Sequence, residues 1–158
     1  MNQQYRLNQE HIHDPYFAGK KPAHASVCQR CGLVQVKGLF KWQDEIPADF
    51  DKFTCPACLR IEQGVPGGVV ILQGAFLDRH KDEIGHIITN CEDKEKKNRP
   101  LERLISVISS GDKIEVTTTY EHLARLIGES VNNAFKGDLD LSYQPKEKFI
   151  RVVWTRDN

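Results

Sequence analysis

Hydrophobic and polar residues change their spacing twice along this chain, and the changes divide it into three regions. Residues 1–26 are polar, contain three of the six histidines and have no periodicity. Residues 27–74 contain short apolar runs interrupted by glycine and proline, and from residue 75 onward longer periodic segments follow. This pattern predicts a polar N-terminal arm over 1–26, a small domain over 27–74 and a larger α+β domain over 75–158.

The larger domain is predicted to begin with an amphipathic helix over residues 75–91. Its apolar positions are spaced by three and four residues: Phe76, Leu77, His80, Ile84, Ile87, Ile88 and Cys91. Such spacing places side chains on one face of a helix. A charged run over 92–99 follows and is stopped by Pro100, so we expect a solvated last turn and a linker there.

Beyond Pro100 the chain alternates apolar and polar residues in a way that is typical of half-buried strands. We predict strands over 104–108, 113–118, 139–143 and 149–154. Thr118 to Glu121 fits a capping box that would begin a helix ending before Gly137. The order strand, strand, helix, strand, strand predicts a two-layer α/β sandwich with an antiparallel sheet. We also expect residues 101–158 to fold without the preceding segments.

Length and composition indicate a globular protein of one ordinary domain or two small ones. The chain has 158 residues, of which 39% are hydrophobic and 28% charged. No apolar run approaches the roughly 18 residues that a membrane span requires, and the N-terminus does not resemble a secretory signal. These features predict a cytoplasmic protein with no membrane partner. In that reducing compartment the five cysteines are expected to be metal ligands or free thiols rather than disulfides.

Two cysteine pairs carry the strongest chemical signal in the sequence. Cys28 and Cys31 are separated by two residues, as are Cys55 and Cys58, and 23 residues lie between the pairs. Each spacing lets a tight turn direct two sulfurs at one ion, and two facing turns complete a tetrahedron. The sequence therefore predicts a four-cysteine ribbon with rubredoxin-like knuckles, which would dominate the domain over 27–74.

The metal itself is less strongly specified than its ligands. The knuckles resemble a zinc ribbon, whereas the segment 42–50 before the second pair also resembles rubredoxin, whose four thiolates hold iron. The glycine that usually follows the second pair in rubredoxins is replaced by Leu59. A four-thiolate site accepts either ion, and we favour zinc with iron as the alternative. Cys91 is expected to be a buried free thiol.

The chain also resembles a known family over most of its length. The residues that carry the likeness are the segments 70–73, 111–116, 124–127 and 151–153, together with the paired CxxC knuckles. They are similar to the archaeal and eukaryotic export adaptors of the large ribosomal subunit, a family named for nonsense-mediated decay, and to a small bacterial family of this size. The resemblance implies a ribosomal or structured-RNA partner and supplies no catalytic residues. The adaptors usually have two four-cysteine sites and additional barrel domains, so the export role itself is not implied.

Formal net charge is zero, which excludes the strongly basic class of nucleic-acid-binding proteins. Any RNA contact must then come from a local patch, and the ribbon and arm contain the candidate residues. Cationic side chains would contact phosphates, and an aromatic ring would stack on a base. The candidates are Lys20, Lys21, Arg30, Lys37, Lys41, Trp42 and Arg60.

These observations favour a non-enzymatic zinc-ribbon protein that binds the ribosome, with the large subunit preferred, or structured RNA. Its role would be in ribosome assembly, dormancy or quality control. The alternative is a rubredoxin-like iron electron carrier with a docking domain. No hydrolase or transferase motif such as GxSxG, HExxH or a P-loop is present, and four thiolates leave the ion no open position for water. We therefore expect neither catalysis nor a small-molecule substrate.

Overall fold

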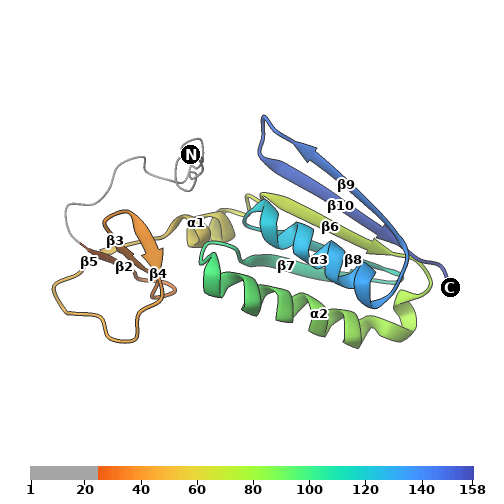
Figure 1. The fold of residues 1–158 in the computed structure, drawn as a ribbon, viewed down its shortest axis with the longest axis horizontal. Coiled ribbons are helices and arrows are strands. Elements are labelled where there is room, and N and C mark those ends of the chain that lie inside the picture. The colour runs from red at the N-terminus through yellow and green to blue at the C-terminus, as the bar shows by residue number, and fades with distance from the viewer. Residues whose placement is uncertain (1–24) are drawn as a thin grey trace. The chain divides into compact units, whose positions relative to one another are not determined.

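The computed structural model describes residues 25–158, and the chain divides into two compact units, Met1–Leu59 and Arg60–Asn158. The described part of the first unit is built around a small four-stranded sheet. The second contains a five-stranded sheet with two helices on one of its faces (Figure 1). Most of the arm predicted over 1–26 lies outside the described residues.

Short strands and two knuckles make up the ribbon of the first unit. Its strands are β2 (Ser26–Cys28), β3 (Val34–Val36), β4 (Leu39–Lys41) and β5 (Asp51–Phe53). They lie in the order β4-β3-β2-β5, with β2 parallel to β5 and the other pairs antiparallel. Helix α1 (Pro56–Gln63) begins in this unit and continues across the boundary into the second.

The second unit has a mixed sheet whose central strand is β6. Its elements are β6 (Gly68–Gln73), α2 (Leu77–Asn98), β7 (Leu104–Ser110), β8 (Lys113–Thr118), α3 (Glu121–Ala134), β9 (Asp138–Gln144) and β10 (Phe149–Thr155). The strand order is β7-β8-β6-β10-β9, and β6 is parallel to β10 but antiparallel to β8. Helix α2 therefore connects β6 to β7 across β8, and α3 connects β8 to β9 across β6 and β10.

One hydrophobic core lies between the sheet and the helices α2 and α3 (Figure 1). Strand β10 illustrates this packing. Its residues Ile150, Val152 and Trp154 are fully buried and alternate with more exposed residues. Helix α3 approaches this strand closely at Gly128, where an added Cβ would lie 2.4 Å from a methyl group of Val152. The buried members of the core are Val70, Leu72, Leu77, Ile84, Ile88, Cys91, Ile114, Val116, Leu123, Ala124, Ile127, Val131, Ile150, Val152 and Trp154.

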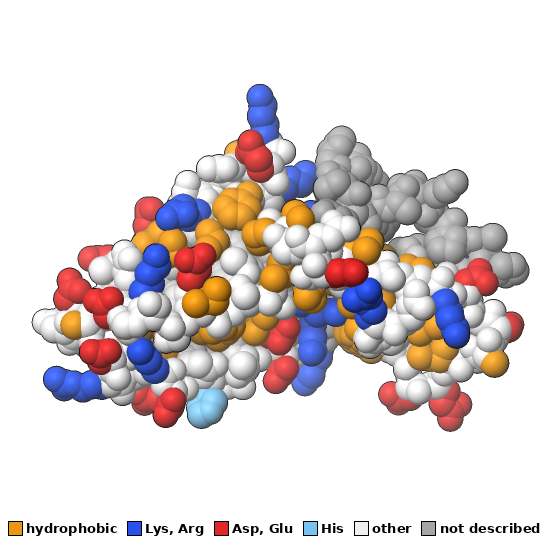
Figure 2. All heavy atoms as spheres, turned by 180° about the vertical axis from the view of Figure 1, so that it is seen from behind, with side chains coloured by type: hydrophobic (Ala, Val, Ile, Leu, Met, Phe, Trp, Pro, Cys, Tyr) orange, Lys and Arg blue, Asp and Glu red, His pale blue; other side chains and the backbone are white. Residues whose placement is uncertain are grey.

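The opposite face of this sheet carries no helix of the unit. Figure 2 views the molecule from that side, where hydrophobic, basic and acidic side chains are mixed. In the register, Val69 lies between Arg151 and Thr117, and Val69 is only 8% exposed. A mainly antiparallel sheet can leave such a face to solvent when polar neighbours flank its apolar residues.

The α+β class is confirmed, but the sheet is not purely antiparallel. The parallel pairs are β6 with β10 and β2 with β5. The domain boundary expected after residue 74 also differs from the observed one, because Val69 to Leu72 form the centre of the second sheet rather than part of the ribbon. All four residues of this run are buried, since β6 has neighbours on both sides and a helix layer on one face.

Helix α2 is longer than its apolar positions indicate. The charged run expected to end it continues as helix to Asn98, and Arg99 caps it by donating its N–H to the carbonyl of Glu95 at 2.8 Å. Glu92 in this run is not simply solvated. Its Oε2 accepts the N–H of Leu104 at 2.8 Å and so attaches the end of the helix to the start of β7.

The predicted capping box at the start of α3 is wrong. The N-cap residue is Tyr120, whose side chain makes no capping hydrogen bond. The hydroxyl of Thr118, the expected cap, instead donates to the carbonyl of Tyr120 at 2.6 Å. A carboxyl group from a distant segment caps the helix, because Glu102 Oε1 accepts the N–H of Leu123 at 2.9 Å. Glu102 is 4% exposed, so this helix terminus is satisfied inside the protein.

The position of β6 changes which fragment is expected to fold. Residues 101–158 lack both the central strand and α2, so the expectation that they fold alone is replaced. We predict that a fragment over 60–158 gives a dispersed amide spectrum and one cooperative urea transition, whereas a fragment over 101–158 does not. The two fragments differ by residues 60–100, which contain β6 and α2 together with the end of α1. A well-folded 101–158 fragment would contradict the role of β6.

Burial of Glu102 predicts a pH-dependent stability. Desolvation raises the pKa of this carboxyl from 4.5 to about 8, although the N–H of Leu123 favours the charged form. Between these values the folded state holds a proton that the unfolded state has released. The stability contribution is therefore complete below pH 4.5 and is lost as the pH rises through 8, by at most about 1.4 kcal/mol per pH unit.

Glu102→Gln should remove this dependence while keeping an oxygen acceptor for Leu123. We expect the free energy of unfolding of the second unit to decline less between pH 5 and 8 in Glu102→Gln than in the unchanged protein. Urea titrations followed by the amide signals of α3 measure the difference. Equal slopes in the two proteins would show that Glu102 is ionised in the folded state.

Candidate metal centre

The first knuckle is formed where β2 ends. Cys28 is the last residue of β2, and its N–H donates to the carbonyl of Leu33 at 2.7 Å, which closes the turn. The carbonyl of Cys28 accepts the N–H of Gly32 at 2.9 Å. Gly32 has φ +83°, a conformation that favours glycine because it has no Cβ. The turn places Cys31 beside Cys28.

The second knuckle joins the end of β5 to the first turn of α1. Cys55 immediately precedes the helix and Cys58 lies in its first turn. The N–H of Cys58 donates to Cys55 Sγ at 3.4 Å, and the N–H of Cys55 donates to Cys28 Sγ at 3.2 Å. Amide donors to sulfur stabilise thiolates, and the second bond also links the two knuckles directly.

The four sulfurs have the spacing of a metal-bound tetrahedron. All four Sγ atoms lie within 4.8 Å of one another, and the Cys28–Cys58 and Cys31–Cys55 separations are both 3.8 Å. A tetrahedron with metal–sulfur bonds of about 2.3 Å has sulfur–sulfur edges of about 3.8 Å. The donor set therefore fits a single ion held by four thiolates, and the predicted ligands are brought together.

Without an ion, this arrangement of sulfurs disfavours thiolates. The pKa of Cys55 is raised far above its ordinary range, first by its contact with the Cys31 sulfur and then by burial. Burial, followed by repulsion from Cys31, raises the pKa of Cys58 to about 11. A bound cation reverses both effects by compensating the sulfur charges, so binding releases protons. Metal affinity should consequently fall with decreasing pH.

Both zinc and iron fit a tetrahedron of four thiolates. In either case every ligand comes from the chain, which is characteristic of structural and electron-transfer sites rather than hydrolytic ones. Cys31 is half-buried, whereas the other three cysteines are buried. The fifth cysteine, Cys91, is 6% exposed in the core between α2 and α3, and burial raises its pKa. The interpretation of Cys91 as a buried free thiol agrees with this position.

The β3–β4 hairpin carries two of the candidate RNA-contacting residues. Lys37 and Gly38 form its two-residue turn with φ values of +53° and +83°, as in a type I′ turn. Lys37 is exposed at the tip, and Lys41 is exposed at the end of β4. Trp42 follows at once and is 39% exposed. Arg30 is exposed in the first knuckle, so these four candidates all lie on the surface of the ribbon.

Charge is separated along the ribbon sequence. Residues 29–43 contain three cations, Arg30, Lys37 and Lys41, and no acid, whereas residues 44–51 contain four acids and no cation. Strand β4, which ends at Lys41, and strand β5, which begins at Asp51, lie at opposite edges of the sheet. The edge formed by the β3–β4 hairpin is therefore basic although the whole chain is neutral.

Arg60 does not belong to this surface. Its side chain is 9% exposed, and its guanidinium lies 4.5 Å from the ring centroid of Tyr120. It also donates to the carbonyl of Val65 at 3.3 Å. The prediction that Arg60 contacts RNA is therefore wrong, because the side chain packs inside the second unit. Lys20 and Lys21 lie outside the described residues.

Sequence reasoning missed the exposed apolar residue of the hairpin. Leu39 pairs with Val36 across the turn and is 64% exposed. A single leucine after a turn gave no signal of exposure in the sequence, and the exposure arises because β4 lies at an edge of the sheet. Leu39 therefore adds an exposed apolar side chain beside the hairpin cations Lys37 and Lys41.

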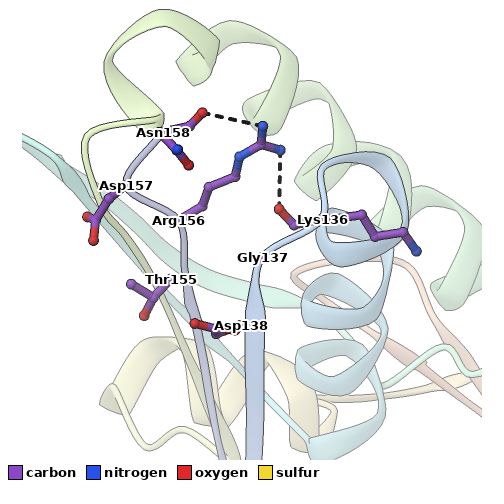
Figure 3. A pocket seen from close by; sticks show the side chains of 7 residues that line it. All are labelled: Lys136, Gly137, Asp138, Thr155, Arg156, Asp157 and Asn158. Atoms are coloured by element: carbon purple, nitrogen blue, oxygen red, sulfur yellow. Dashed lines mark hydrogen bonds between the residues drawn. The ribbon is translucent and has the colours of Figure 1, made fainter.

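A surface hollow of about 450 Å³ lies in the second unit, at one end of β9 and β10 (Figure 3). Arg156 crosses it, donating to the carbonyls of Lys136 at 3.2 Å and Asn158 at 3.4 Å. The guanidinium also lies 4.0 Å from the ring centroid of Phe76. Two cations and two acids line the hollow, together with Gly137, Thr155 and Asn158. Its lining provides neither a dominant charge nor a cysteine or histidine.

Comparisons with protein-family models, with curated proteins and with solved structures find no match for the chain. The likeness to the ribosomal export adaptors consequently stays a prediction. Among the described residues, no helix is both long enough and apolar enough to cross a membrane.

The sulfur geometry predicts one tetrahedral ion per chain. Cobalt added to the metal-free protein should give the intense visible bands of tetrahedral thiolate coordination, with one equivalent at saturation. Cys55→Ser should abolish this spectrum and unfold the ribbon, because coordination contributes about 10–16 kcal/mol to the folding of comparable small zinc domains. Cys91→Ser is the matched control and should retain full cobalt binding. A folded ribbon without metal would contradict this prediction.

Proposed function

We propose that the chain is a non-enzymatic zinc-ribbon protein that binds the ribosome, preferentially its large subunit, through ribosomal RNA. The observation that supports this proposal is the charge separation of the ribbon. It places Arg30, Lys37 and Lys41 on a segment free of acids, next to the exposed Trp42. We call these four residues the basic edge.

The basic edge combines the two kinds of contact that single-stranded or looped RNA uses. Lysine and arginine neutralise phosphates, and an indole ring can stack on an unpaired base, a contact worth about 1–3 kcal/mol. The two-residue turn fixes the backbone at the hairpin tip from which the Lys37 side chain extends. Structured RNA offers both groups at bulges and loops, which favours ribosomal RNA over a regular duplex.

Three phosphate contacts make a modest electrostatic contribution. They predict that the logarithm of affinity falls with the logarithm of salt concentration with a slope of roughly −2 to −3. The neutral chain adds no general attraction to nucleic acid. Binding should therefore depend on a defined site and persist at moderate salt, as expected of a factor in ribosome assembly, dormancy or quality control.

Zinc is the proposed ion, and its role is to hold the basic edge in shape. With four thiolate ligands the ion has no position for water, which supports a structural rather than a catalytic role. The second candidate is an iron electron carrier, favoured by the half-buried Cys31, through which electrons could leave the site. Colour and elemental analysis separate the two: a ferric tetrathiolate is red, and stoichiometric iron in the purified protein would favour the carrier.

Sedimentation of tagged protein through sucrose gradients tests the ribosomal proposal. We expect the protein to migrate with the large subunit or with complete ribosomes during growth or starvation. Reversal of the three cations, Arg30→Glu, Lys37→Glu and Lys41→Glu together, should move it to the top of the gradient without loss of zinc. Trp42→Ala alone should weaken binding about tenfold or more.

A matched control reverses three exposed cations of the second unit, Lys113, Lys146 and Arg151. Arg156 is unsuitable because it packs on Phe76. The control variant should sediment with ribosomes as the unchanged protein does. Protein that remains at the top of the gradient in every growth phase would contradict the proposal, and equal loss in both triple variants would contradict the assignment to the basic edge.

A further inference from the structure

The two edges of the five-stranded sheet differ in charge. Edge strand β7 and the glycine after it, residues 104–111, contain no charged residue. Val107 and Ile108 on this strand are 48% and 59% exposed. The other edge strand, β9, carries Asp138 and Asp140. Exposed, uncharged and partly apolar edge strands are the ones that pair readily with another strand.

Only part of β7 is available for such pairing. At its beginning, the N–H of Leu104 already donates to Glu92 of α2, and the register with β8 shifts between Leu104 and Ser106. From Ser106 to Ser110 the register with β8 is regular. This leaves a five-residue stretch, 106–110, with Ile108 at its centre.

The hairpin that joins β7 to β8 determines which main-chain groups face outward. Its two-residue turn, Gly111 and Asp112, follows the pair Ser110–Lys113. Such a turn is closed by a hydrogen-bonded pair, and hydrogen-bonded and non-hydrogen-bonded pairs then alternate along the strands. The main-chain groups of Ser110 and Ile108 are therefore directed to β8, and those of Val107 and Ser109 are directed to the edge.

We propose that two copies of the chain associate through β7, antiparallel and around a two-fold axis at Ile108, to form a continuous ten-stranded sheet. In this register Val107 of each copy lies opposite Ser109 of the other and exchanges both of its main-chain hydrogen bonds with it. Ile108 lies opposite itself in a non-hydrogen-bonded pair, where side chains approach most closely. The outward-facing N–H and C=O groups of Val107 and Ser109 in both copies then all have hydrogen-bond partners.

We favour a second copy as the partner of this edge because the edge has no charge. When two identical strands pair, any charge on one lies near the same charge on the other. Like charges directly opposite each other are unfavourable in an antiparallel pair, and the stretch 106–110 contains none. On β9, a two-fold axis at Leu139 would bring Asp138 of each copy opposite Asp140 of the other. The two-fold axis also makes the interface closed, so pairing stops at a dimer rather than a filament.

Light scattering coupled to size exclusion tests the proposal on the full, metal-loaded chain. We expect a concentration-dependent mass of twice 18.1 kDa that falls to 18.1 kDa in Ile108→Lys, which places two cations opposite each other. Leu141→Lys is the matched control: Leu141 lies on β9 and is 42% exposed, so the dimer should be unchanged. Metal content and circular dichroism verify that both variants fold.

Ser109→Pro and Ile108→Cys test the register. Proline at 109 removes an N–H that faces outward, which an edge strand tolerates, so the fold should persist and the dimer should be lost. Mild oxidation of Ile108→Cys should give a covalent dimer that the unchanged protein, with its own five cysteines, does not form.

A monomer at all concentrations would overturn the proposal, as would a dimer that persists in Ile108→Lys or dissociates in Leu141→Lys. A dimer lost in Ile108→Lys but retained in Ser109→Pro would also overturn it, because association would then not use the main chain of β7. None of these measurements involves RNA, so their outcome is independent of the proposed ribosomal function.

Discussion

The convergence of four sulfurs on one point is the constraint on which the ribbon depends. In its described part, three of the six buried hydrophobic residues are cysteines, and the others are Leu33, Val34 and Ala57. So few aliphatic side chains cannot offset the entropy of ordering a segment of this length. The ion therefore takes the place of a hydrophobic core, and the knuckle and hairpin that carry the basic edge depend on the sulfur ligands for their shape.

The second unit is stabilised by a different principle. Its core is continuous and mainly aliphatic around the fully buried Trp154, and two glutamate side chains attach its helices to neighbouring segments. Glu92 reaches from α2 to the start of β7. Glu102, in the segment that joins α2 to β7, caps α3. These contacts, the first part-buried and the second buried, connect successive elements of the unit. They stabilise it only while every buried donor and acceptor keeps its partner.

Local sequence patterns predicted the elements and the ligands but not the pairing of strands. Spacing alone identified Cys28, Cys31, Cys55 and Cys58, because chelation by a tight turn is a local property. The partner of β6 is not local: Gln73 contacts Thr155, 82 residues away. The uninterrupted apolar run Val69 to Leu72 did carry a signal, since a short continuous apolar run between turn residues is typical of a buried central strand. Arg60 was misassigned because its partner, Tyr120, is also distant in sequence.

The pairing of β6 with β10 has a consequence for the order in which the protein forms during synthesis. The central strand of the second unit emerges early from the translating ribosome, but its neighbour β10 emerges about 80 residues later, so the sheet cannot close in the meantime. The ribbon is complete by residue 59 and needs only its ion. The nascent chain is therefore expected to present a finished metal domain while β6 and its apolar side chains still await their last strand.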